Sequence, residues 1–581
     1  MYRFERKFRA APLLLVSLLT PYTARAAEAA SSASDSTITD TAAAAAVDIP
    51  RHKCINDDSE LNTQFAQWQA AGLPVGQIQI EQHSIFDEND PDENNWLFRG
   101  VNYLHINTHE SVLRDDLLIK TGEPFDAEKV RESERILRRR AYVREPLITA
   151  VGECTERVDL KVQLHEVWTL MPQISYSHKG GESTSSLGLV DKNILGSGRE
   201  LSVQFEKNVD YSRRYIGYRD PNWGNLHGIL TAQFGQTDEG EFHRLEMERP
   251  FYALNTTWAG GIFTHQQIQT SALYFRGDKV QQFEQDRSRR SFYYGASDGL
   301  QGDHVARWFI GVAREVDLFS PVLETQSTPA IPGNRAYTYP FIGWQSIDAH
   351  YIKTSNVNQI GVTEDYNLGW QIDVKLGVSA DVLSDAQNAT VVEAAIERAF
   401  LFGNDKLLYN KWQFSGKYEQ KEWRNSFIDA TVRYHQGDFA TQQFYVGLRA
   451  RYGLHLDLDQ YIYLGGDLGL RGYPLRYQVG DHSLLLNTEW RWFTQYELLQ
   501  LADVGFAVFH DVGRAWFDDR DNGRYGGWLH DAGFGIRLAP TRIGESRHGG
   551  GTVIHIDLAF PFDAREDVGN YQWLVQAKQS F

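Results

Sequence analysis

An arginine placed between glycines dominates the part of this sequence that could do chemistry. Residues 464–474 read LGGDLGLRGYP and contain four glycines around Arg471. Glycine loses too much backbone entropy to build the interior of a strand or helix, so this run predicts a tight, shaped loop. A guanidinium group on such a loop can reach a distant carboxylate and bind it through two parallel hydrogen bonds. The centre of the predicted loop is Leu470, Arg471, Gly472 and Tyr473.

Three carboxylates on the segments after the loop are candidate partners for Arg471. In segments where apolar and polar residues alternate, Glu489, Asp511 and Asp557 fall on the polar side, opposite large aliphatic and aromatic residues. If these segments are strands of one curved sheet, the three carboxylates point into one interior. We expect Arg471 to pair with Glu489 or Asp511. The alternative is an arginine exposed to solvent on an outer loop.

Two other patterns could carry catalysis, but each lacks its surroundings. Residues 295–299 read GASDG, a literal G-x-S-x-G, yet the residues after Ser297 predict a loop and a strand, whereas a nucleophile elbow needs a helix there. The pair His165-Glu166 lacks the second histidine of a zinc motif. A serine esterase is therefore the weakest of three functional hypotheses. We expect no catalytic residue, no metal site and no cofactor.

The amino terminus has the three parts of a secretory signal. Basic residues lie at positions 3, 6, 7 and 9, an apolar run covers residues 10–19, and the small-residue site Ala24-Arg25-Ala26 follows. We expect residues 1–26 to be a signal peptide. Residues 27–50 are mainly Ala, Ser, Thr and Asp, which predicts a disordered linker. No later run of roughly 18 apolar residues predicts a transmembrane helix.

The composition favours a protein built of strands. The chain has 28 Tyr, 31 Phe and 15 Trp beside 49 Gly, which suits a transmembrane barrel with aromatic girdles and tight turns. A secreted all-β enzyme or lectin shares this composition. The formal net charge of −18 argues against a nucleic-acid partner, because such a partner requires a basic face.

Cys54 and Cys154 are the two cysteines of the chain. Export past the inner membrane would place them where disulfides persist, so we expect them to be paired. Neither has a second cysteine or a suitably spaced histidine beside it, which favours a structural staple over a metal or catalytic site. The staple would join the first helix of the mature chain to the next domain.

A small α+β domain is expected over residues 76–168, after a short helical segment within residues 51–75. In that segment Leu61, Phe65 and Trp68 share one helical face. The domain then shows the order β-α-α-β-β, with strands over residues 77–86, 147–154 and 157–168 and helices over residues 110–119 and 126–140. Beyond it, over residues 169–581, segments of about ten residues alternate in the manner of a transmembrane β-barrel.

These features together resemble the POTRA-barrel superfamily of bacterial outer membranes, which includes the BamA and TamA insertases and the transporters of two-partner secretion. The β-α-α-β-β order, with GEPFD opening its second helix, resembles the periplasmic POTRA module. Arg471-Gly472-Tyr473 resembles the RGY/RGF motif of the sixth outer loop, and residues 192–198 resemble an NLLGxG turn. The F-x-D-x-G and G-x-G-x-R motifs of these barrels are similar to segments containing Phe509 and Gly513, and Gly533, Gly535 and Arg537.

A terminal aromatic residue such as Phe581 resembles the insertion signal of outer-membrane barrels. The resemblance implies sixteen antiparallel strands, of which eleven precede the motif loop and five follow it. The sequence itself has about seventeen candidate strands ahead of the loop. We therefore expect some of them to be one bent strand read twice, or an outer-loop hairpin. Residues 273–411 do not align with the family.

The resemblance implies a non-enzymatic protein of the outer membrane with its small domain in the periplasm. Such a protein inserts or translocates unfolded polypeptide clients, and its partners are membrane lipid, these clients and accessory periplasmic proteins. The barrel would be gated by the RGY loop clamped on Glu489 and Asp511. The alternative is a passive pore or surface antigen whose tethered loop is structural.

Overall fold

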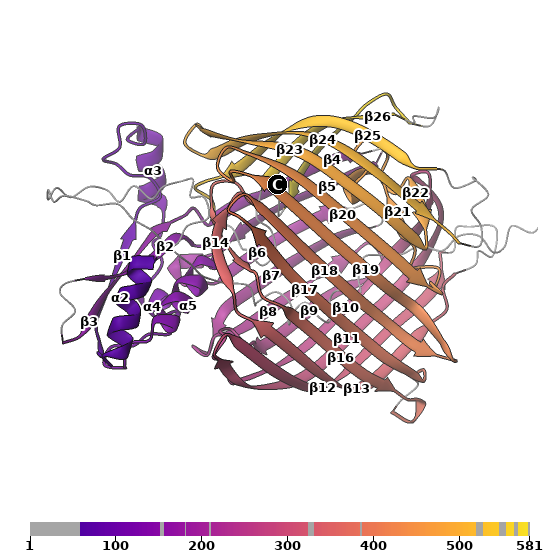
Figure 1. Cartoon of the computed structure of the whole chain (residues 1–581). Helices are drawn as coiled ribbons and strands as arrows, with labels where there is room; N and C mark the ends of the chain where they lie inside the picture. The colour runs from indigo at the N-terminus through magenta and orange to yellow at the C-terminus, as the bar shows by residue number, and fades with distance from the viewer. Residues whose placement is uncertain are drawn as a thin grey trace, which may run out of the picture.

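The structure is a computed structural model that describes residues 59–151, 156–179, 182–207, 211–322, 331–383, 386–518, 527–544, 553–562 and 568–578. The expected signal peptide and linker, both cysteines of the expected disulfide (Cys54 and Cys154) and the terminal Phe581 lie outside these residues. Figure 1 shows two parts, a small domain in indigo and purple and a large sheet that runs from magenta to yellow. The prediction of a mostly β chain with a large antiparallel sheet is confirmed.

The small domain is a three-stranded mixed sheet with helices packed on it. Its elements are α2 (Ser59–Ala70), β1 (Val75–His83), α3 (Trp96–Leu104), α4 (Glu110–Asp115), α5 (Ala127–Arg138), β2 (Val143–Val151) and β3 (Val158–Glu166). The central strand β3 is parallel to β1 and antiparallel to β2. Among the described residues, no helix is long and apolar enough to cross a membrane. The helix α3 is an addition to the expected β-α-α-β-β order.

The period of two in β3 produces the core of the small domain. Val158, Leu160, Val162 and Leu164 are all fully buried and pack on one side of the sheet against the helices. Burial of each such side chain contributes about 1.5–3 kcal/mol to the free energy of unfolding. The helix α5 begins where the carboxylate of Asp126 accepts hydrogen bonds from two backbone N–H groups of its first turn.

The large sheet closes into a barrel in which each strand pairs antiparallel with the next and β27 lies beside β4. We call the contact between β27 and β4 the seam. The barrel strands are β4 (Leu170–Lys179), β5 (Glu182–Asp191), β6 (Glu200–Lys207), β7 (Ser212–Trp223), β8 (Gly228–Thr237), β9 (Glu241–Arg249), β10 (Trp258–Phe275), β11 (Asp278–Gln301), β12 (His304–Pro321), β13 (Arg335–Asp348), β16 (Gln371–Ser379), β17 (Ala389–Phe402), β18 (Lys406–Glu419), β19 (Glu422–Gly437), β20 (Gln442–Leu454), β23 (His482–Leu498), β24 (Ala502–Trp516), β25 (Leu529–Pro540), β26 (Val553–Pro561) and β27 (Gln572–Lys578).

Within the described residues the barrel has twenty strands, which corrects the sixteen expected from the resemblance. Fifteen strands precede the motif loop and five follow it. A separate hairpin, β14 (Tyr351–Ser355) with β15 (Thr363–Asn367), pairs only with itself among the described strands. Fifteen barrel strands plus these two make seventeen, the number of candidate segments ahead of the loop. The number of candidate segments was therefore close to the number of described strands, but the hairpin lies at the domain end and not at an outer loop as expected.

The two faces of the barrel wall differ in chemistry. Large apolar side chains point outward and are exposed, as at Leu187, Phe234 and Ile310. The residues between them point inward and many are buried and polar, as at Gln345 and Glu393. This is the alternation expected of a strand that faces an apolar medium on one side and a polar interior on the other.

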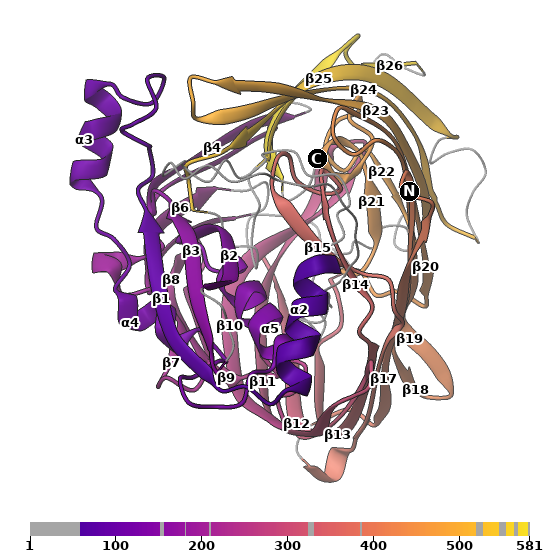
Figure 2. The ribbon, with the colours of Figure 1, turned by 60° about the vertical axis from the view of Figure 1, so that its left-hand side comes forward.

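Two connections fold into the barrel from opposite ends. The small domain lies at one mouth, which we call the domain end; the other is the distal end (Figures 1 and 2). Residues 455–481, between β20 and β23, enter from the distal end and contain β21 (Ile462–Leu464), the short helix Gly466–Leu468 and β22 (Gln478–Gly480). We call them the motif loop. The hairpin β14–β15 enters from the domain end, and Figure 2 shows it in that mouth beside α5.

Candidate functional site

Arg471 lies inside the barrel against two carboxylates of the wall. Its Nε is 2.7 Å from Asp511 Oδ2 and its Nη2 is 2.8 Å from Asp511 Oδ1, so both oxygens of that carboxylate accept hydrogen bonds. Its Nη1 donates to Glu489 Oε1 at 2.7 Å. All three side chains are buried. The strands β23 and β24 thus supply one carboxylate each to one arginine of the motif loop, and we call this arrangement the arginine clamp.

Neighbouring side chains fix the geometry of the arginine clamp. The ring of Phe509 lies under the guanidinium group, with its centroid 3.5 Å from Arg471 Cζ, which adds a cation–π contact. Asn487 Nδ2 donates to Asp511 Oδ1 at 2.7 Å and to the carbonyl oxygen of Gly469 at 2.9 Å. The wall therefore binds both the side chain and the backbone of the motif loop.

A second shell of charge surrounds the arginine clamp. Arg491 Nε donates to Glu489 Oε2 at 2.8 Å, and Arg537 Nη1 donates to Asp557 Oδ1 at 2.6 Å. Asp557 Oδ2 lies 3.9 Å from Arg471 Nη1. Buried ions need partners because transfer from water is costly, and these alternating charges provide them.

The motif glycines leave room for these groups. A Cβ at Gly535 would lie 1.9 Å from Asp557 Oδ1, and one at Gly533 would lie 2.5 Å from Cζ of the Phe509 ring. A Cβ at Gly513 would lie 3.1 Å from Cδ1 of Leu485, a neighbour of the motif loop's own Leu470 in the same apolar cluster. These glycines therefore leave the space in which the motif loop and its ion pairs pack against the wall.

The motif loop itself is shaped by close approach to the wall. A Cβ at Gly472 would lie 2.6 Å from Cβ of Asp531 on β25, so this position requires glycine. Gly469 has a φ of 111°, in the region that favours glycine. The hydroxyl of Tyr473 donates to the carbonyl oxygen of His530 at 2.9 Å. The Arg-Gly-Tyr segment thus contacts three consecutive strands, β23, β24 and β25.

A second anchor, absent from the sequence prediction, holds the start of the motif loop to the opposite wall. Arg335 of β13 donates to both oxygens of Asp459, at 2.6 and 2.5 Å, and to Asp457 at 2.9 Å. An apolar cluster lies beside it, in which loop residues such as Leu456 and Tyr463 pack with Tyr274 of β10. The motif loop therefore spans the barrel and is fastened on both sides.

The tip of the hairpin β14–β15 is buried in the barrel. Asn356 Nδ2 donates to the carbonyl oxygen of Phe439 at 2.7 Å, and Gln443 Nε2 donates to the carbonyl oxygen of Asn356 at 3.3 Å. Val357 packs with Phe439, and Ile360 packs with a separate group on β23 to β26. The tip reaches across the domain end to a distant part of the wall.

The stem of the hairpin is bound to the small domain. Arg138 of α5 donates to both oxygens of Asp365, at 2.8 and 2.5 Å, in a fully buried pair. Lys353 donates to Glu134 of α5 at 2.9 Å. Glu145, on a bulge of β2, accepts hydrogen bonds from the N–H and the hydroxyl of Thr363 at 3.0 and 2.8 Å. The hairpin thus connects α5 and β2 to the barrel interior.

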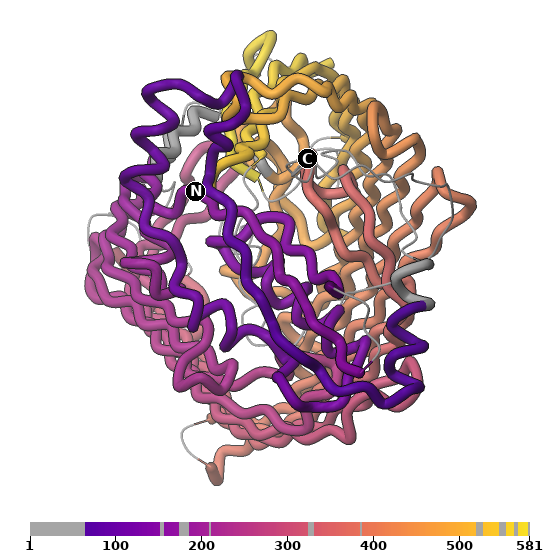
Figure 3. The backbone as a smooth tube through the Cα atoms, turned by 90° about the vertical axis from the view of Figure 1, so that its left-hand side faces the viewer, coloured from indigo at the N-terminus to yellow at the C-terminus, as the bar shows by residue number. Residues whose placement is uncertain are grey.

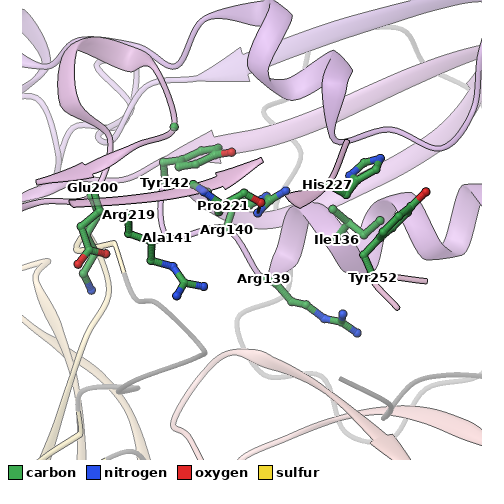
Figure 4. Close-up of a pocket in the computed structure, with 12 residues that line it drawn as sticks. Ile136, Arg139, Arg140, Ala141, Tyr142, Glu200, Arg219, Pro221, His227 and Tyr252 are labelled. Carbon is green, nitrogen blue, oxygen red and sulfur yellow. Dashed lines mark hydrogen bonds between the residues drawn. The ribbon is translucent and has the colours of Figure 1, made fainter. Parts of the chain in front are cut away.

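A small pocket lies at the junction between the small domain and the barrel (Figure 4). Its volume is about 60 Å³, and its lining includes Arg139 and Arg140 after α5 and Arg219 of β7. Arg140 pairs with Asp116 and donates to the carbonyl oxygen of Pro221 at 3.2 Å, which ties the domain to the barrel. A cavity of this size holds a few water molecules. It is too small to be a path for a polypeptide.

The residues considered for catalysis have structural surroundings. Ser297 lies in β11, where its hydroxyl donates to the carbonyl oxygen of Ala306 at 2.7 Å, and the chain returns as β12 rather than as a helix. Glu166 accepts hydrogen bonds from the N–H and hydroxyl of Thr108. Burial lowers the pKa of His165 to about 4, and His83, Arg144 and Arg542 add to the shift. Within the described ranges no group of three His, Cys, Asp or Glu could hold a metal ion.

Fold and site together define a large antiparallel barrel that carries a small α/β domain at one mouth and an inward-folded loop held by buried ion pairs. No protein-family model matches the chain, and no curated protein matches it. BamA, named in the superfamily that the sequence resembles, is among the similar solved structures. The three reported below have TM-scores under 0.5.

Three of these solved structures have low sequence identity to the chain. BamA from Haemophilus ducreyi lacking POTRA domains 1–3 is 13% identical, with a TM-score of 0.37 over 86% of this chain and 84% of that one. CdiB from Escherichia coli is 12% identical, with a TM-score of 0.42 over 86% and 75%. CdiB from Acinetobacter baumannii is 12% identical, with a TM-score of 0.34 over 87% and 73%.

Proposed function

We propose that this protein resides in an outer membrane and inserts polypeptides into that membrane or moves them across it. The observation that carries the proposal is the hairpin β14–β15, which occupies the domain end of the barrel and is bound to α5 and β2 of the small domain. The element that would receive a client is therefore connected to an element that lies in the mouth of the barrel. A passive pore has no use for such a connection.

The exterior of the barrel supports the membrane location. Its strands present exposed side chains such as Leu187, Phe234, Ile310 and Phe534 at alternate positions. An apolar surface of this extent marks contact with another apolar phase. The small domain would then lie on the periplasmic side as a single POTRA-like module, and the outer-membrane lipid would surround the wall.

The small domain offers a client an edge to bind. β2 pairs with β3 alone among the described strands, so its other edge has backbone groups for an added strand. Its bulge at Glu145, which has a φ of 43°, places that side chain on Thr363 of the hairpin. A client strand added beside this bulge would compete with the hairpin for the same space. Client binding would thus loosen the hairpin.

Two experiments test this function. A photo-crosslinking amino acid at Thr149 of β2 is expected to capture unfolded outer-membrane barrel proteins or secreted polypeptides, whereas the same probe at exposed Lys120 is not. Depletion of the protein is expected to lower the amounts of such clients in the outer membrane. Unchanged levels of outer-membrane and secreted proteins after depletion, with no crosslinks from position 149, would contradict the proposal and leave the passive pore or surface antigen.

The arginine clamp has a separate role in this proposal. Because Arg471 fastens the motif loop to β23 and β24, a polypeptide leaving through the distal end must displace that loop or leave through the seam beside it. The RGY loop would then act as a gate whose resting position is set by buried ion pairs.

A further inference from the structure

The helix α3 carries the most exposed apolar surface of the small domain. Trp96, Leu97, Tyr103 and Leu104 are 79%, 52%, 88% and 69% exposed and lie on one face of the helix, in its first and last turns. Ile106, just after the helix, is 51% exposed. Isolated exposed hydrophobic residues are ordinary, but five within eleven positions form a patch that requires a partner.

The opposite face of α3 is firmly attached to the domain. Phe98 stacks on Phe86 with ring centroids 3.9 Å apart. Asn102 Nδ2 donates to the carbonyl oxygen of Phe86 at 2.9 Å, and its Oδ1 accepts from the N–H of the same residue at 3.2 Å. Asn95 caps the first turn. The helix is therefore a fixed platform that presents its apolar face outward.

Contacts with two barrel turns place this platform at the rim. Arg542, in the turn after β25, pairs with Glu93, and its guanidinium group lies 5.3 Å from the centroid of Phe86. The N–H of His109 donates to the carbonyl oxygen of Gly196 in the turn between β5 and β6 at 2.8 Å. Figure 3 shows the purple segment of α3 over the wall beside the yellow C-terminal strands, away from the centre of the barrel.

The rim beside α3 is also apolar. Exposed side chains on the turns of the domain end include Leu195, Leu499 and Ile543. They continue the apolar exterior of the barrel toward the small domain. The patch on α3 is therefore an extension of the surface that the barrel presents to lipid.

We infer that α3 is a membrane-interface helix, which lies on the lipid leaflet at the domain end beside the seam. Trp96 and Tyr103 on the exposed face of a short helix suit the boundary between headgroups and acyl chains. The partner is the apolar part of that boundary, not its charge. The helix has a single basic residue, Arg99, and follows the acidic segment of residues 87–93, so anionic headgroups would be repelled.

The inference rests on the proposed membrane location of the barrel, and one crosslinking experiment tests both separately. The full chain is reconstituted in phosphatidylcholine vesicles with a benzophenone amino acid at one of three positions. Position 103 tests α3; position 234, on the exposed exterior of β8, reports the membrane location; position 67, exposed on α2, is the control in the same domain. Mass spectrometry measures covalent adducts with acyl chains.

We expect lipid adducts at positions 103 and 234 in at least about tenfold higher yield than at position 67. Adducts at 234 but not at 103 would overturn the inference and leave the proposed function intact. Adducts at neither position would overturn the membrane location as well. Crosslinks from 103 to a second copy of the chain, or to another protein in membranes of the native host, in place of lipid would identify a protein partner and contradict the inference.

A second measurement removes the apolar face without touching the barrel. The double change Leu97→Glu and Leu104→Glu is expected to lower the lipid adduct yield at position 103 about tenfold, because two carboxylates cannot enter the apolar boundary. The matched change Gln67→Glu on α2 should leave the yield unaltered. A difference in gel migration between heated and unheated samples confirms that the barrel of each variant is folded. An unchanged yield in the folded double variant would overturn the inference.

Discussion

The motif loop and the hairpin both fold into the barrel, but they are held by different parts of the molecule. Arg471 and Asp459 bind the motif loop to opposite sides of the wall. The stem of the hairpin binds the small domain through Asp365 and Lys353. Its tip contacts the wall through apolar packing and through the hydrogen bonds of Asn356. The motif loop is thus part of the barrel, whereas the hairpin depends on the position of the small domain.

This difference separates two kinds of closure. Moving the motif loop away from the wall requires breaking buried ion pairs, which leaves charges without partners. Moving the hairpin out of the domain end would require α5 and β2 to move as well, because their side chains bind its stem. Under the proposed function, a client bound to the small domain would therefore act on the hairpin directly and on the motif loop only later.

The largest expected effect comes from the arginine clamp. Arg471→Ala leaves the buried carboxylate of Asp511 without its counter-ion and leaves Glu489 with Arg491 alone, so the free energy of unfolding should fall by about 3–5 kcal/mol. Urea unfolding of the refolded barrel measures this loss. Arg471→Lys keeps the charge but not the planar fork and should lose less. Equal stability of the alanine variant and the natural chain would show that the motif loop is not fastened as described.

The motif glycines provide a smaller effect in the same region. Gly535→Ala would place a methyl group 1.9 Å from Asp557 Oδ1, which forces the Arg537–Asp557 pair apart. The free energy of unfolding should fall by about 1–3 kcal/mol. Gly333→Ala is the control, because a Cβ there meets nothing within 4 Å. If both variants lose the same stability in urea, the glycine serves backbone flexibility rather than space.

A change that loosens the hairpin should alter the conductance of the barrel and not its stability. Arg138→Ala removes the buried partner of Asp365 and should raise the population of the displaced hairpin at least about tenfold, since 1.4 kcal/mol is one factor of ten. Single-channel recordings should show more frequent openings while the urea midpoint of the barrel is unchanged. Arg131→Ala, which removes a half-exposed pair with Glu128 on the same helix, should do neither. A shift of the midpoint as large as that of Arg471→Ala would erase the distinction between the two segments.

The smallest effect concerns pH and the small domain. The pKa of His165 falls from 6.5 to about 4 on folding, so its neutral form stabilises the folded domain above pH 6.5 and that contribution is lost as the pH falls toward 4. Amide exchange of β3, corrected for the intrinsic pH dependence of exchange, should report a loss on the order of 1 kcal/mol across this window. His165→Gln should flatten the profile. An unaltered profile would assign the acid response to other groups.

The arginine clamp could be anticipated because a strand has a fixed period. Once residues on β23 and β24 are assigned to faces, Glu489 and Asp511 must point inward, and one arginine on a glycine-rich loop is close enough to reach them. The structure places all three together. The function of the motif glycines as room for side chains follows only from the packed structure.

The hairpin and its anchors could not be anticipated in the same way. Apolar and polar residues alternate in β14 and β15 as in the other strands. No local pattern shows that these two strands lie outside the barrel wall. Their position is decided by pairs distant in sequence, such as Arg138 with Asp365, 227 residues apart, and Arg335 with Asp459, 124 residues apart for the motif loop. No pattern within a strand carries that information.

The helix α3 was not predicted from the sequence, for another reason. Apolar residues lie on both of its faces, with Phe98 and Val101 inward and Trp96, Leu97, Tyr103 and Leu104 outward, so no single amphipathic stripe marks it. The strand number was also beyond the sequence resemblance. The number of alternating segments was close to the number of described strands, and the expected total of sixteen came from the family rather than from the residues.

The barrel strands differ in length around the wall, so the two sides of the distal end differ. β11 has 24 residues, whereas β6 and β27 near the seam have 8 and 7. A tilted strand needs about 9–11 residues to cross a bilayer, so in the proposed membrane location β11 would extend beyond the membrane, whereas the described residues of β6 and β27 would not. The motif loop packs against this long-stranded part of the wall at Tyr274, Phe283 and Phe319. Under the proposed function, a client leaving on the distal side would meet less wall beside β6 and β27 than beside β11.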